Sequence, residues 1–208
     1  MTLIDQNAIV LFQGDSITDA GRNRNDWANL GSGYANLVTS LFTSKYPEKQ
    51  ATFLNRGISG DRVIDLERRW EVDCLDLKPS LLSVYVGIND TWRRYDNNDP
   101  LSTEEYYTTY RRLLSRAKEQ LNIKLVLVEP FVLPVNDSQK QWREDLDPKI
   151  QAVRELAGEF KAIYVPLDGL FAQAATQTGP AYWAPDGVHP SPAGAALIAE
   201  AWLQAVKA

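Results

Sequence analysis

The sequence is poor in residues on which several classes of protein depend. Its 208 residues include one cysteine, one histidine and one methionine. The lone cysteine, Cys74, excludes an internal disulfide, so the chain is compatible with a reducing compartment. Its context favours a packed helix end over a nucleophile. One histidine and one cysteine also exclude an ordinary zinc site, which needs several such ligands.

Long apolar runs are absent as well. No run approaches the roughly 18 residues that span a bilayer, and the apolar stretch 8–12 is too short for the core of a signal peptide. The net charge is −5, with acidic and basic residues intermixed. We therefore expect a soluble cytoplasmic protein whose main partner is neither nucleic acid nor a membrane.

The chain does contain alternating strand and helix patterns, in a number that fits one domain. With 44% hydrophobic residues and no linker or repeat, residues 1–208 are expected to form a single domain. Short runs rich in aliphatic and β-branched residues predict five strands, at 8–12, 51–55, 81–86, 124–129 and 162–165. Helical spacing between them predicts a three-layer α/β/α fold, flavodoxin-like, with a mainly parallel five-stranded sheet.

Two boundaries are predicted for the helices of this fold. Asp61 is a plausible N-cap for the helix that carries Val63 and Leu66. Ser191 is expected to cap the last helix, with Pro192 at its first position. The segment 131–139 is mixed in composition and is read as a loop.

The only histidine lies in Asp186-Gly-Val-His189-Pro, and a hydroxyl follows the first strand in Gly-Asp-Ser16. A serine needs a base to become a nucleophile, and His189 is the sole candidate. Asp186, three positions earlier, can reach the far ring nitrogen and orient the imidazole. Taken alone, Gly-Asp-Ser is more often a turn or helix cap, and His189 is an inert loop residue about as often as a base.

Acyl transfer also needs donors for the negative charge that develops on the carbonyl oxygen. Gly60 follows the second strand and its backbone N–H can approach a ligand closely. Asn89 follows the third strand and offers a side-chain amide, and the Ser16 N–H is a third donor. The carboxyl ends of parallel strands share one edge, so these segments should converge with His189.

These four strings, in this order, resemble the four blocks of the SGNH (GDSL-type) hydrolases, and the resemblance runs from about residue 10 to residue 202. It implies that Ser16 is the nucleophile, His189 the base and Asp186 its orienting partner. It also implies an oxyanion hole of Ser16, Gly60 and Asn89, and no cofactor or metal.

The flanking sequence is similar to that of intracellular acetyl-xylan and acetyl-xylooligosaccharide esterases. This similarity implies a serine esterase that removes acetyl groups from carbohydrate hydroxyls and assembles as a homo-oligomer. One departure is that Pro185, rather than an aromatic residue, precedes Asp186. The absence of a long apolar lid also favours a small acyl group.

Three tryptophans, Trp27, Trp92 and Trp183, fall in loops expected at the active edge, where aromatic faces suit sugar rings. Together with Asp15, beside Ser16, they are the candidate substrate-binding residues. Packing or an oligomer contact would explain each tryptophan equally well. Four arginines near this edge could bind an anionic substrate or pair with nearby aspartates: Arg22, Arg24, Arg93 and Arg94.

Other functions on a similar sheet fit less well. A receiver domain needs a lysine after the fifth strand, and this chain has none there. A flavodoxin-type phosphate loop after the first strand would be less acidic than the one in this sequence. A carboxylate-only magnesium site at Asp15, Asp90 and Asp186 has no recognisable ligand spacing. The remaining alternatives are a lysophospholipase, thioesterase or broad arylesterase of the same superfamily, and an inactive sugar-binding module on this scaffold.

Overall fold

The computed structural model describes residues 2–208 and has a five-stranded sheet in which every neighbouring pair is parallel. The strand order is β2-β1-β3-β4-β5. The strands are β1 (Ile9–Gly14), β2 (Thr52–Asn55), β3 (Leu81–Tyr85), β4 (Lys124–Val128) and β5 (Ile163–Val165). All five expected strands are confirmed to within two residues at either end, because each is a short apolar run between turn residues.

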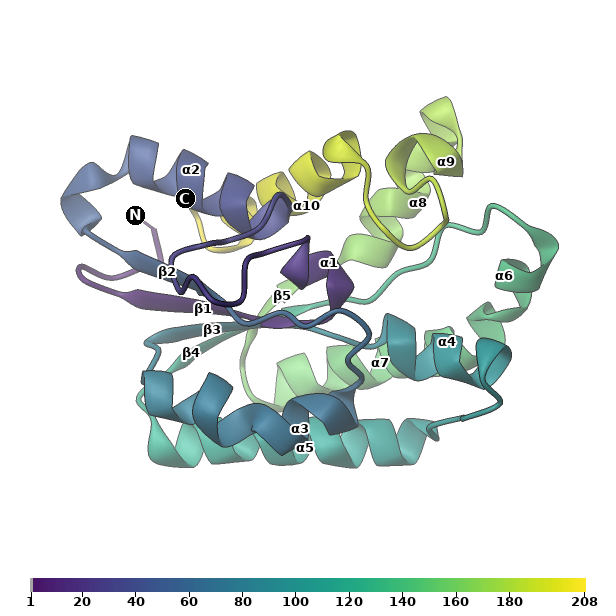
Figure 1. Cartoon of the computed structure of the whole chain (residues 1–208), viewed down its shortest axis with the longest axis horizontal. Helices are drawn as coiled ribbons and strands as arrows, with labels where there is room; N and C mark the ends of the chain where they lie inside the picture. Colours follow the sequence, from purple (N-terminus) through teal and green to yellow (C-terminus); the bar gives the residue numbers. More distant parts are fainter. Residues whose placement is uncertain (1) are drawn as a thin grey trace.

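Helices cover both faces of the sheet, which confirms the three-layer α/β/α architecture (Figure 1). One face carries α2 (Tyr34–Lys45), α8 (Leu167–Thr178) and α10 (Pro192–Ala205), and the other carries α3 (Val63–Asp73), α5 (Thr103–Gln120) and α7 (Arg143–Glu159). Shorter elements complete the chain: α1 (Ser16–Asp19), α4 (Ile88–Asp96), α6 (Asp137–Gln141), α9 (Pro180–Trp183), η1 (Pro47–Lys49) and η2 (Leu75–Leu77).

The central strand β1 shows why its sequence is almost continuously apolar. Successive side chains of a strand point to opposite faces, and here both faces are covered. Val10 and Phe12 are fully buried toward α2 and α10, whereas Leu11 is fully buried toward α3 and α5. The buried indole of Trp202 also donates to Ser83 Oγ on β3, at 3.0 Å, so its one polar atom is satisfied.

The structure corrects one helix boundary and confirms another. Arg62, not Asp61, is the N-cap of α3, and its backbone N–H donates to the Asp65 carboxylate at 3.0 Å. Asp61 is paired instead with Arg69 at 2.7 Å. At the last helix the expected cap is present, since Ser191 Oγ accepts the Gly194 N–H at 3.2 Å.

The one predicted loop ends in a helix, and two further helices were not predicted from the sequence. The segment read as a loop at 131–139 runs into α6, and α8 and α9 lie between β5 and the Asp186–His189 turn. Cys74 is buried at the end of α3, as expected, and burial raises the pKa of its thiol to about 12. Within residues 2–208 no helix combines the length and apolarity needed to cross a membrane.

Candidate active site

The carboxyl edge of the sheet brings the predicted chemical residues together from distant parts of the chain. Ser16 opens α1 directly after β1, Gly60 lies between β2 and α3, and Asn89 lies in the first turn of α4 after β3. Asp186 and His189 lie in the turn between α9 and α10. Because parallel strands end at one edge, the short connections after β1, β2 and β3 deliver Ser16, Gly60 and Asn89 to the same place.

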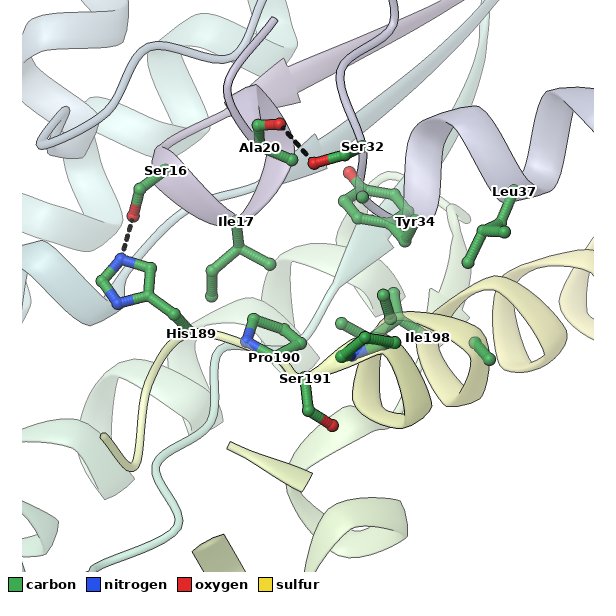
Figure 2. A pocket seen from close by; sticks show the side chains of 14 residues that line it. Ser16, Ile17, Ala20, Ser32, Tyr34, Leu37, His189, Pro190, Ser191 and Ile198 are labelled. Atoms are coloured by element: carbon green, nitrogen blue, oxygen red, sulfur yellow. Dashed lines mark hydrogen bonds between the residues drawn. The ribbon is translucent and has the colours of Figure 1, made fainter. Parts of the chain in front are cut away.

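The Ser16 hydroxyl, the His189 imidazole and the Asp186 carboxylate form a continuous hydrogen-bonded chain. Ser16 Oγ is 2.9 Å from His189 Nε2, and His189 Nδ1 is 2.6 Å from Asp186 Oδ2 (Figure 2 shows the first contact). The side chains of His189 and Asp186 are 45% and 50% exposed. This geometry allows the imidazole to take a proton from the serine while the carboxylate fixes its orientation.

Asp186 is surrounded by donors on its own turn. Its Oδ1 accepts the backbone N–H groups of Val188 at 2.9 Å and His189 at 2.7 Å, while its Oδ2 faces the imidazole. Partial burial raises the pKa of this carboxyl, but the hydrogen bonds from His189 and Val188 outweigh it and hold the pKa below its usual value. Asp186 is therefore a stable anion beside the imidazole.

The turn itself is held by Gln139, which sequence reasoning did not single out. The Gln139 amide donates to the Asp186 carbonyl at 2.6 Å and accepts the Val135 N–H at 3.0 Å. Gly187 has φ of 84°, and a Cβ there would lie 2.6 Å from the Gln139 Oε1. Glycine is thus required both by the backbone conformation and by the close approach of Gln139.

The three expected oxyanion donors lie in different local environments. The Ser16 N–H is at the first position of α1, where N–H groups have no intrahelical acceptor. Gly60 has φ of 90°, and beyond its chain neighbours no atom of residues 2–208 lies within 4 Å of where its Cβ would be. The buried Asn89 donates one Nδ2 hydrogen to the Asp61 carbonyl at 3.1 Å, and the second hydrogen has no acceptor among residues 2–208.

Asp15, predicted to bind substrate, is fully buried and its side chain turns into the protein. Its Oδ1 caps α1 by accepting the Ile17 N–H at 3.0 Å, and burial raises its pKa to about 7. The structure thus corrects the substrate-binding role of Asp15. Asp90 is also fully buried, and burial raises its pKa to about 7 while its Oδ1 accepts the Val63 N–H.

All three tryptophans were expected in loops, but Trp92 lies on α4 and Trp183 ends α9, and of the three only Trp27 lies in a loop. The ring centre of Trp92, on α4, lies 6.1 Å from that of His189. Trp27 is 55% exposed and stacks on the Arg56 guanidinium, 3.7 Å from the ring centre. Trp183 packs edge-on against Tyr182. Of the three, Trp92 is the best placed to meet a group bound at Ser16.

Most of the arginines near this edge are engaged by carboxylates rather than left for an anionic substrate. Arg24 pairs with Asp19 at 2.6 Å, Arg93 pairs with Asp96, and Arg94 pairs with Asp145 at 3.2 Å. The buried Arg22 donates to the Gly57 carbonyl at 2.9 Å. Residues 2–208 also contain no cluster of three acidic, histidine or cysteine side chains that could hold a metal.

A pocket of about 450 Å³ opens beside the Ser16–His189 contact, between α1, the start of α2 and the start of α10 (Figure 2). Sequence reasoning did not anticipate it. Its floor includes Ala195 and Ala196 from a stretch rich in small residues. That richness is the one signal in the sequence for open space near His189.

The GDSL-like lipase/acylhydrolase family matches residues 12–197. The chain belongs to this family. The SGNH-type resemblance of the four blocks is therefore confirmed, and this GDSL-like protein is a carboxylic ester hydrolase.

One relative of this GDSL-like hydrolase is an acetylxylan esterase from Geobacillus stearothermophilus, 36% identical over 205 residues, covering 95% of this chain and 93% of that protein. The crystal structure of that esterase, Axe2, matches with a TM-score of 0.91 and covers 98% of this chain and 95% of its own at 36% identity. Its solved variants include catalytic mutants in which a serine, an aspartate or a histidine is replaced by alanine.

A structure from Parabacteroides merdae, described as a GDSL-like lipase, matches with a TM-score of 0.94 at 37% identity. It covers 98% of this chain and 97% of its own. The three-layer fold with a parallel five-stranded sheet is therefore that of solved GDSL-like hydrolases over nearly the whole chain.

Proposed function

We propose that this hydrolase works through an acyl-enzyme on Ser16, with His189 as the general base and Asp186 as its orienting partner. The observation that carries the proposal is the pair of contacts at 2.9 Å and 2.6 Å that joins the three side chains. The relative Axe2 supports it, because its catalytic mutants involve the same three residue types, with the same spacing between aspartate and histidine.

In this mechanism Ser16 Oγ attacks the acyl carbonyl carbon while its proton passes to His189 Nε2. The negative charge that forms on the carbonyl oxygen is stabilised by the N–H groups of Ser16 and Gly60 and by the free amide hydrogen of Asn89. As the tetrahedral intermediate collapses, the bond to the alcohol oxygen breaks and His189 returns its proton to that oxygen. Water then attacks the acyl-enzyme by the same route and regenerates Ser16.

For the substrate we propose an acetyl ester of a carbohydrate hydroxyl. The support is the acetylxylan esterase relative, together with the aromatic face of Trp92 next to His189. An aromatic ring offers a rigid, mostly apolar platform to a sugar and loses little conformational entropy on binding. A lysophospholipase, thioesterase or broad arylesterase chemistry on the same triad is the alternative.

The test is acetate release from acetylated xylo-oligosaccharide, beside p-nitrophenyl acetate as a general ester. We expect the wild type to deacetylate both and Ser16→Ala to lose both activities by several orders of magnitude while remaining folded. Cleavage of p-nitrophenyl acetate without acetate release from the sugar would keep the esterase and reject the carbohydrate substrate. Wild-type protein that binds the sugar without any turnover would point to a sugar-binding module.

A further inference from the structure

Asp61 links two of the three expected oxyanion donors. It directly follows Gly60, and its carbonyl accepts an Nδ2 hydrogen of Asn89 at 3.1 Å. The Asp61 N–H donates to the Ile58 carbonyl at 3.2 Å and closes a four-residue turn with Gly60 in third place. A positive φ at that place of a turn favours glycine, and Gly60 has φ of 90°. A shift of residue 61 would therefore move the Gly60 N–H and the Asn89 amide together.

The carboxylate of Asp61 is paired with Arg69 on α3. Arg69 Nε donates to Asp61 Oδ2 at 2.7 Å, and each of the two side chains is 14% exposed. A pair so largely removed from solvent is screened less by salt than an exposed one. The neighbouring pair on the same helix, Arg68 with Asp65, differs because its arginine is 73% exposed. Asp61 is thus attached to α3 through a mostly buried ion pair.

Arg69 also reaches the end of the strand that precedes Ser16. Its Nη2 donates to the Gly14 carbonyl at 3.2 Å, two residues before Ser16. Its Nη1 has three further acceptors, which are the Arg56 carbonyl at 2.7 Å, Gln13 Oε1 at 2.9 Å and Asp73 Oδ2 at 3.2 Å. These acceptors belong to the segment after β2, to β1 and to α3 itself. One guanidinium therefore joins the Ser16 segment to the Gly60 turn.

This set of contacts requires an arginine. A guanidinium presents donors on three nitrogens in a fixed planar fork, whereas a lysine carries all its donors on one flexible nitrogen. Within residues 2–208 the hydrogen-bond partners of Arg69 do not include the triad side chains. An effect of Arg69 on turnover must therefore pass through the residues that it holds.

We propose that Arg69, acting through Asp61, is a positioning residue that fixes the Gly60 and Asn89 donors relative to Ser16. The inference rests on the proposed function, because it needs negative charge to develop on a carbonyl oxygen beside these donors. Such donors are effective when they are preorganised at hydrogen-bond distance from that charge. A misplacement of about 1 Å can lower the rate by roughly 100-fold.

Arg69→Lys tests this role, since it keeps the positive charge but cannot reach the same acceptors. With p-nitrophenyl acetate we expect kcat to fall by roughly 30-fold and KM to change by less than about threefold, because the donors act on the transition state. Arg68→Lys is the matched control on the preceding residue of α3, where the side chain is exposed, and it should keep wild-type kinetics. Melting temperatures of both variants are compared with that of the wild type.

A double-mutant cycle with Asn89→Ala separates positioning from a general loosening of the fold. In the Asn89→Ala background only the Gly60 donor is left to be misplaced, so the loss of kcat caused by Arg69→Lys should be at least about threefold smaller than in the wild type. A purely structural defect would lower kcat by the same factor in both backgrounds. If Arg69→Lys fails to fold, Asp61→Asn takes its place in the cycle. It keeps an oxygen for Arg69 Nε but removes the charge, and should lower kcat by about fivefold.

Equal losses in the two backgrounds would overturn the positioning role. So would values of kcat within about twofold of wild type for both Arg69→Lys and Asp61→Asn. Failure of the proposed function has a different signature, because wild-type turnover would then be absent or would survive in Ser16→Ala. Equal losses in an enzyme that still depends on Ser16 and is impaired by Asn89→Ala reject only this inference.

Discussion

Three carboxyl groups lie at or near the carboxyl edge of the sheet, one of them half-exposed and two fully buried. Asp186 is half-exposed and uses both oxygens to accept N–H groups from its own turn and from the His189 ring. Asp15 and Asp90 are fully buried, and each accepts a backbone N–H through Oδ1. Their Oδ2 atoms have no hydrogen-bond partner among residues 2–208.

The difference teaches what decides the charge of a carboxyl group at such a site. At Asp186 the hydrogen bonds outweigh burial and lower the pKa, so the group stays ionised beside the imidazole. At Asp15 and Asp90 burial outweighs the hydrogen bonds and raises each pKa to about 7. Asp15 is thus buried although it adjoins Ser16 in the sequence, whereas Asp186 is half-exposed and keeps its charge beside His189.

Among these carboxyl groups, we expect the loss of the Asp186 charge to have the largest effect on kcat. We expect Asp186→Asn to lower kcat on p-nitrophenyl acetate by roughly 1,000-fold or more, because a neutral amide favours the wrong imidazole tautomer and cannot stabilise the cation. The melting temperature should stay near that of the wild type, since the side chain is half-exposed. A kcat within tenfold of wild type would remove Asp186 from the triad.

A substitution at Asn89, which lies next to the buried Asp90 in α4, tests the proposed oxyanion hole. Asn89→Ala should lower kcat by about 100-fold, since one preorganised donor to the developing oxyanion is lost. Steady-state kinetics on p-nitrophenyl acetate measures this directly. If kcat stayed within threefold of wild type, the amide would have no role in stabilising the oxyanion.

Gln139 supports the exposed carboxylate through its turn. Gln139→Met keeps the length of the side chain but removes its hydrogen bonds to the Asp186 carbonyl and the Val135 N–H. We expect kcat to fall by about tenfold with KM little changed, because the position of His189 loosens. The matched control is Gln141→Met, an exposed position on the same helix. Equal kinetics for the two variants would contradict a positioning role.

The smallest effect concerns the pH dependence of stability. The pKa of Asp90 is raised to about 7, so the folded state holds its proton more tightly than the unfolded state between about pH 4 and pH 7. Its contribution to the free energy of unfolding is therefore lost as the pH rises through this window. Asp90→Asn keeps an oxygen for the Val63 N–H but removes the titration.

Urea unfolding of wild type and Asp90→Asn at pH 5 and pH 7 measures this term. The variant should gain stability relative to the wild type between the two pH values. Asp65→Asn is a suitable comparison, because that carboxylate is partly exposed and ion-paired rather than fully buried. A constant difference between wild type and Asp90→Asn at both pH values would contradict the raised pKa.

Much of the site was predictable because local sequence patterns determine where its residues lie. The apolar runs mark the strands, and residues just after a parallel strand must reach one edge, which is why Ser16 and Asn89 could be placed there. The spacing of Asp186 and His189 within one turn likewise follows from local sequence. The oligomeric state and the cellular compartment remain predictions of the sequence.

Other features depend on side-chain direction or on distant segments, which local patterns do not encode. The single turn of α1 points Asp15 inward, although it adjoins Ser16. Gln139 lies in a segment without clear periodicity and meets the Asp186 turn only in three dimensions. The apolar pocket likewise arises where α1, α2 and α10 come together. Sequence alone indicated no more than small residues after His189.

The central claim is that Ser16 carries the acyl group during turnover. Rapid mixing of the wild type with excess p-nitrophenyl acetate, followed by an acid quench and peptide mass spectrometry, tests it directly. We predict one acetyl group on the peptide that contains Ser16, formed in step with a burst of p-nitrophenol and absent in Ser16→Ala. An acetyl group on a different residue, or turnover that persists in Ser16→Ala, would contradict the account.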